Sequence, residues 1–224
     1  MSIHQRGQPD PNEPPEWTYG DEEVWRSESI TDDEKAEIRK KNDRITELGR
    51  WAMEQWRTLP MDNAIEIVDR RRRSEDGEDR YHLTLDLTHF LSLAGRQQEA
   101  ERMIDEMIAV LPDDVRLPIS KASLYFYSMD DPEKALDAID IALSRAQRTG
   151  FFRREALGVK ARILLKLGRG EQLTRTLEEI MSLEMKSRIP DIGRERDFVD
   201  RAPPGMIADD VLARYNFFCP KRDE

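Results

Sequence analysis

One pattern recurs along the middle of the chain at about the length of a helical hairpin. Three segments share it: AGRQQEAERMIDEMI from Ala94, MDDPEKALDAIDIAL from Met129 and LGRGEQLTRTLEEIM from Leu167. Aligning Ala100, Ala135 and Leu173 gives spacings of 35 and 38 residues, close to the roughly 34 residues that two antiparallel helices and their turns require. Such a unit cannot bury its apolar stripe alone, so the pattern predicts hairpins that stack on a shared core.

Apolar residues on either side of the Gly95 turn recur at the three- and four-residue steps of amphipathic helices. They are Leu83, Leu87, Phe90, Leu91 and Ala94 in the first helix, and Ala100, Met103, Ile104, Met107 and Ile108 in the second. The second helix is expected to end at Leu111-Pro112, because proline cannot continue the hydrogen-bond ladder. A second hairpin is then predicted over residues 116–146.

The spacing of small and large residues over about residues 81–182 resembles the tetratricopeptide repeat family. The matching positions are Ala122 and Ala161 in first helices, Ala100 and Ala135 in second helices, Gly95 and Gly168 in turns, and Pro112 after the first unit. The chain departs from the family at Thr88 and Leu173, where smaller residues are preferred, and it lacks the family's early tryptophan. The resemblance implies an all-α, right-handed α-solenoid of about three stacked antiparallel hairpins.

The first 30 residues are acidic and proline-rich, unlike the rest of the chain. Residues 1–34 hold ten acidic and two basic residues, a charge of -8 out of the chain's formal net charge of -10. Because aliphatic residues are few, residues 1–30 are expected to form a disordered arm. The aromatic residues Trp17, Tyr19 and Trp25 leave three outcomes open: docking on the protein's own surface, binding to a partner, or packing as a simple extension.

An N-terminal helical hairpin is predicted over residues 31–80. Thr31-x-x-Glu34 has the form of a capping box at the start of a helix, and Leu59-Pro60 marks the end of that helix. A second, shorter helix is expected from about Asp62. This pair is expected to cap the N-terminal end of the stack.

Residues 183–224 are irregular, with chain breaks at Ile189-Pro190 and Ala202-Pro203-Pro204-Gly205. A short amphipathic helix is predicted from about Ile207 to Phe217. Its apolar face comprises Val211, Leu212, Tyr215 and Phe218. We expect this helix to cap the last repeat; dimerisation through the same face is the alternative, so a homo-oligomer stays open.

The composition argues against several classes of protein. No apolar stretch approaches the roughly 18 residues that span a bilayer, and the N-terminus lacks the basic start and apolar core of a secretory signal. A cytoplasmic protein without membrane contact is therefore expected. The single cysteine, Cys219, excludes an intramolecular disulfide.

The basic run Arg70–Arg73 is followed by the acidic stretch 74–79 and has no aromatic platform, so no nucleic-acid partner is expected.

One cluster of residues could support chemistry. His82, Asp86 and His89 lie at three- and four-residue steps on one face of a predicted helix, and imidazole and carboxylate groups are suitable ligands for zinc or iron. The spacing is not that of a known metalloprotease helix, and no second cluster supplies further ligands. No nucleophile motif, phosphate-binding loop or dinucleotide fingerprint is present, so neither a cofactor nor enzyme activity is expected. A metal-dependent enzyme centred on these three residues is the alternative.

By the resemblance, the first helix of each hairpin lines a concave groove that holds a peptide or partner helix. The expected groove residues are His82, Asp86, His89, Lys121, Leu124, Tyr127, Arg162 and Lys166. Family members that clamp chaperone C-termini use lysine and asparagine where this chain has Leu85, His89, Ser120 and Leu124. Binding of chaperone tails is therefore not expected. The sequence favours a non-enzymatic adaptor or scaffold that binds a protein partner, and a chaperone for secreted or unfolded clients is a further alternative.

Overall fold

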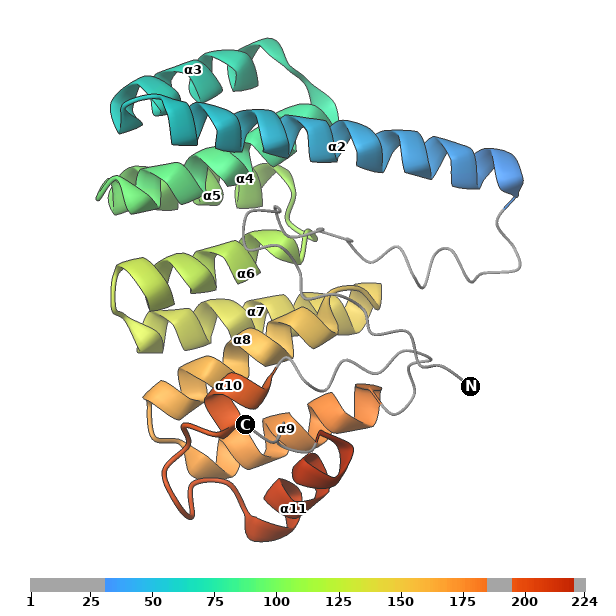
Figure 1. The fold of residues 1–224 in the computed structure, drawn as a ribbon, viewed down its shortest axis with the longest axis vertical. Coiled ribbons are helices and arrows are strands. Elements are labelled where there is room, and N and C mark those ends of the chain that lie inside the picture. Colours follow the sequence, from blue (N-terminus) through green and yellow to red (C-terminus); the bar gives the residue numbers. More distant parts are fainter. Residues whose placement is uncertain (1–30, 185–194, 220–224) are drawn as a thin grey trace, which may run out of the picture. The chain divides into compact units, whose positions relative to one another are not determined.

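The computed structural model describes residues 31–184 and 195–219 of the chain, and every regular element in them is helical (Figure 1). The predicted arm over residues 1–30 and the break at Ile189-Pro190 lie outside the described residues. The chain divides into two compact units, an N-terminal unit that ends at Asp86 and a C-terminal unit that begins at Leu87. The all-α prediction is confirmed for the described residues.

The N-terminal unit is built from a helical hairpin followed by most of a third helix. Helix α2 spans Asp32–Thr58, α3 spans Met61–Ser74, and α4 spans Gly77–Leu93, so the unit boundary falls inside α4. Helix α2 begins directly after Thr31 and ends before Leu59-Pro60, as the capping box and the proline predict.

Small, aliphatic and aromatic side chains form the core of the N-terminal unit. They are Leu48 and Ala52 from α2, Ala64, Ile65 and Val68 from α3, and Tyr81 and Leu83 from α4. Ion pairs at the edge of this core join α2 to α4: Arg44 Nε donates to Asp79 Oδ2 at 2.9 Å, and Lys41 Nζ lies 2.6 Å from Glu78 Oε2. These ion pairs connect the hairpin to the third helix.

The C-terminal unit continues from the end of α4 through a series of helices. They are α5 (Gln97–Val110), α6 (Arg116–Ser123), η1 (Leu124–Ser128), α7 (Pro132–Thr149), α8 (Arg153–Lys166), α9 (Gly170–Glu184), α10 (Arg196–Val199) and α11 (Asp209–Phe218). Consecutive helices from α6 to α9 pack against each other. Short connections between them make neighbouring helices antiparallel. This is the hairpin organisation that the repeated pattern predicts.

Turn residues explain where these helices begin and end. Asp131 caps α7, because its side chain accepts a hydrogen bond from the Lys134 backbone N–H at 3.1 Å, with Pro132 at the first helical position. Gly168, in the turn between α8 and α9, has a φ of +70°, which a residue with a Cβ adopts only with strain. At Gly170 a Cβ would lie 2.6 Å from the Met206 carbonyl oxygen, so only glycine allows the segment before α11 to approach α9.

The core of the C-terminal unit runs from α6 to α11. Alanines of α7 and α8 allow close packing, among them Ala135, Ala142 and Ala161. Beyond α9, Phe198 of α10 and Val211 and Tyr215 of α11 are buried in the same core. The sequence pattern predicted α11 two residues earlier than it begins, and it did not predict the four-residue helix α10.

One element departs from the predicted α-helical geometry. Residues Leu124–Ser128 form a π-helical turn, η1, at the end of the first helix of the second hairpin. In a π-helix the backbone hydrogen bonds join residues five positions apart, one more than in an α-helix. Here the Met129 N–H donates to the Leu124 carbonyl at 3.1 Å. The sequence reads LYFYS here, so the widened turn carries three aromatic residues in succession.

Candidate functional site

Two aromatic rings of η1 lie next to a lysine of α8. The Phe126 and Tyr127 rings meet edge to face with centroids 4.8 Å apart, and Lys166 Nζ lies 5.2 Å from the Phe126 ring centroid. Arg162 is one turn before Lys166 on the same face of α8. We call Phe126, Tyr127, Arg162 and Lys166 the aromatic–cation row. Three of its members are predicted groove residues, and Phe126 is an addition that the π-helical turn provides.

Exposure differs along the aromatic–cation row. Tyr127 is 63% exposed, whereas Phe126 is partly buried. Lys166 forms an ion pair with Asp130, and both side chains meet solvent. The Arg162 guanidinium lies 5.4 Å from the ring of buried Phe198 and donates to the Gly158 carbonyl at 3.2 Å. The row therefore offers an exposed tyrosine ring next to Phe126 and Lys166, while the Arg162 guanidinium is held against Phe198.

Two predicted groove residues of the second hairpin do not join this row. Leu124 is 5% exposed and belongs to the core of the fold. Lys121 faces α5 instead, where it forms an ion pair with Asp105. The neighbouring Tyr125 hydroxyl donates to Glu101, also on α5. The prediction placed Lys121, Leu124 and Tyr127 at three-residue steps on one α-helical face, but these three side chains have different surroundings.

The three predicted residues of α4 are also in different surroundings. His82 and Asp86 belong to the N-terminal unit, where His82 is buried, while His89 belongs to the C-terminal unit and is exposed. The described residues contain no group of three or more histidine, cysteine, aspartate or glutamate side chains that could hold a metal ion. The predicted ligand set therefore has no metal-binding arrangement among the described residues.

Asp86 has an unusual electrostatic environment. Burial raises the pKa of its carboxyl from the ordinary 3.8 to about 6. The folded state thus binds this proton more tightly than the unfolded chain does. The stabilisation from the protonated form is complete below pH 3.8 and is lost as the pH rises to about 6. At neutral pH the charged carboxylate costs free energy of folding.

Replacing this carboxyl with an amide should therefore stabilise the protein in a pH-dependent way. We expect Asp86→Asn to raise the free energy of unfolding by about 1–3 kcal/mol at pH 8 and by almost nothing at pH 4. Urea unfolding at both pH values measures this difference. Asp43→Asn removes an exposed carboxylate of α2 and is the control, expected to match wild type at both pH values. An equal effect of Asp86→Asn at pH 4 and pH 8 would contradict the assignment.

The basic run at the end of α3 forms ion pairs within the N-terminal unit. Arg70 pairs with Glu66, Arg71 with Glu75, and both Arg72 and Arg73 with Asp69. The Arg71 guanidinium also lies 4.3 Å from the Trp51 ring centroid. These four arginines are engaged with the protein's own side chains.

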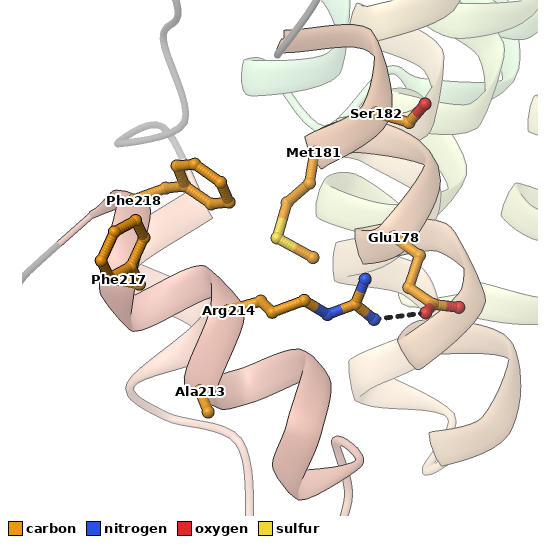
Figure 2. A pocket seen from close by; sticks show the side chains of 7 residues that line it. All are labelled: Glu178, Met181, Ser182, Ala213, Arg214, Phe217 and Phe218. Carbon is orange, nitrogen blue, oxygen red and sulfur yellow. Dashed lines mark hydrogen bonds and ion pairs between the residues drawn. The ribbon is translucent and has the colours of Figure 1, made fainter.

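A second surface feature of the C-terminal unit is a cleft between α9 and α11 (Figure 2). Its volume is about 830 Å³, and it is lined by Glu178, Met181, Ser182, Ala213, Arg214, Phe217 and Phe218. Arg214 reaches from α11 to Glu178 on α9, with 2.6 Å between Nη2 and Oε1. The sequence pattern singled out Phe218 as part of an apolar helix face, but it did not predict the cleft.

Comparison with protein-family models, curated proteins and solved structures gives no match. The described part of the chain has no helix that is both long and apolar enough to cross a membrane. The resemblance to tetratricopeptide repeats rests on the residue pattern, with which the packed helical pairs are compatible.

Proposed function

We propose that the protein is a non-enzymatic interaction module that binds a segment of a partner protein along the aromatic–cation row. The observation that carries this proposal is the exposure of Tyr127, at 63%, beside Phe126 and Lys166. An exposed tyrosine is typical of binding surfaces, because tyrosine, tryptophan and arginine are enriched at energetically important contacts.

The chemistry of the row indicates what kind of segment it would accept. An apolar or aromatic side chain of the partner would stack on Tyr127, and a carboxylate would bind Lys166. The ion pair of Lys166 with Asp130 is no obstacle, since its side chains are 40% and 82% exposed and such pairs contribute little stability. The proposed partner is therefore an acidic segment that carries apolar side chains.

The proposal includes the arrangement that the resemblance implies. The helical pairs α4–α5, α6/η1–α7 and α8–α9 would stack as tetratricopeptide-like hairpins in a right-handed solenoid, with helices at both ends covering the stack. In this arrangement η1 and α8 belong to first helices, which line the concave surface. Packing of α6 against α8, across the helix between them in sequence, supports the assignment.

Substitutions in the row should remove the partner without unfolding the protein. We expect Tyr127→Ala combined with Lys166→Glu to reduce recovery of the partner at least tenfold, because both the stacking surface and the attractive charge are lost. Quantitative affinity capture from native extract, with circular dichroism as a folding check, measures this.

Ile141→Ala is the matched control for this experiment. It removes an apolar side chain of α7 that is 50% exposed, outside the row. We expect this variant to recover the partner as the wild type does. Equal recovery by the wild type and the row variant would refute binding at this surface.

A further inference from the structure

The cleft between α9 and α11 combines a protruding ring with a hollow on the same surface. Phe217 is 82% exposed, and its ring meets that of Phe218 edge to face with centroids 5.4 Å apart. Figure 2 shows both rings at the end of α11, while Met181 of α9 points into the space between the helices. A phenyl ring left this exposed beside an apolar hollow marks an interaction surface.

The charges of this surface are already compensated. Arg214 Nη2 lies 2.6 Å from Glu178 Oε1 and 3.6 Å from Asp210 Oδ2, so covering the cleft would not bury an unpaired cation. Residues 87–224 hold 22 basic and 24 acidic residues, whereas residues 1–86 carry -8 of the net charge. Two copies of the C-terminal unit can therefore approach each other without strong repulsion.

We propose that this cleft binds a second copy of the chain in a two-fold symmetric dimer. A two-fold interface brings the same patch of each copy together, so a protruding group must lie next to a recess that accepts it. The α9–α11 surface has both features: Phe217 of each copy would enter the hollow beside Met181 and Ala213 of the other.

The size of the surface sets the strength of this dimer. Phe217 and Phe218 are 82% and 42% exposed, so at roughly 150–250 Å² for a fully buried ring the rings of two copies would bury about 400–600 Å² in total. Stable interfaces bury about 1,200–2,000 Å². The dimer is therefore weak and reversible, and its formation depends on protein concentration.

Sedimentation velocity of the full chain from 5 to about 500 µM tests the proposal. We expect the wild type to shift from monomer toward dimer over this range, and Phe217→Ser to weaken self-association at least tenfold. Phe151→Ser is the matched control, because it removes another exposed phenylalanine of the C-terminal unit, outside the cleft. A wild type that stays monomeric, or a Phe217→Ser variant that dimerises like the wild type, would overturn the proposal.

A mixing experiment tests whether the ring of one copy enters the hollow of the other. Ser182→Arg fills the hollow but keeps Phe217, whereas Phe217→Ser lacks the ring and keeps the part of the hollow that Met181 and Ala213 line. Each variant alone should be monomeric. An equimolar mixture should recover part of the association, since one of the two contacts can form. No recovery in the mixture would contradict the two-fold arrangement. Neither variant alters the aromatic–cation row, so capture of a partner there is judged independently.

Discussion

Arg154→Ala is expected to destabilise the C-terminal unit by about 3–5 kcal/mol, among the largest effects of any single substitution in this protein. The guanidinium of Arg154, on α8, donates from Nε to Glu184 at the end of α9. It also donates from Nη2 to Glu195, just before α10, at 2.5 Å. Glu184 and Glu195 are 7% and 1% exposed. Alanine would leave two buried carboxylates beside each other without this cation.

The adjacent Arg153 is the control for this prediction. Its Nε donates to Glu179 at 2.8 Å, but both side chains are about 40% exposed. We expect Arg153→Ala to cost less than about 1 kcal/mol, because solvent screens an exposed ion pair. Urea unfolding followed by circular dichroism compares the two variants. Similar losses for Arg153→Ala and Arg154→Ala would show that the buried cluster does not hold α8, α9 and α10 together.

A compensated variant separates the cost of leaving these carboxylates without Arg154 from the loss of packing. Combining Arg154→Met with Glu184→Gln and Glu195→Gln removes all three charges and keeps similar side-chain volumes. We expect this variant to regain part of the stability lost in Arg154→Ala, since replacing a complete buried ion cluster is far less harmful than breaking it.

The helices could be predicted from the sequence because their causes are local. Leu59-Pro60 ends α2, Pro132 begins α7, and Gly168 turns the chain between α8 and α9. Each of these effects acts within a few residues, and the apolar period adds the buried face. The π-helical turn η1 could not be predicted in this way, since LYFYS is compatible with an ordinary α-helix.

The candidate site was only partly predictable because its contacts join distant residues. Tyr127 and Lys166 were identified from helical register, but the ring of Phe126 that links them lies outside that register. The Arg154 cluster joins residues 30 and 41 positions apart, and the cleft forms where α11 meets α9. No periodicity within one helix reports which helices come together, so these features required the structure.

Tyr215→Ala should be about as destabilising as Arg154→Ala, at roughly 3–5 kcal/mol, through a different mechanism. Tyr215 of α11 is fully buried in the core of the C-terminal unit. Its ring also lies 5.7 Å from the Arg196 guanidinium, and burial raises the pKa of its hydroxyl. Alanine would leave a large cavity and remove the main anchor of the helix that we propose as a cap.

Tyr127→Ala makes the same chemical change at a side chain that is 63% exposed, and it should cost less than about 0.5 kcal/mol. Tyr215→Phe, which keeps the ring, should cost only about 1 kcal/mol. Urea midpoints at low protein concentration, where the proposed dimer is dissociated, measure the stability of all three variants.

If α11 covers the end of the stack, Tyr215→Ala should also lower the temperature at which the protein aggregates, because apolar side chains of α9 become exposed. A Tyr215→Ala variant as stable as Tyr127→Ala would mean that α11 contributes little to the core, and the proposed cap would have to be abandoned.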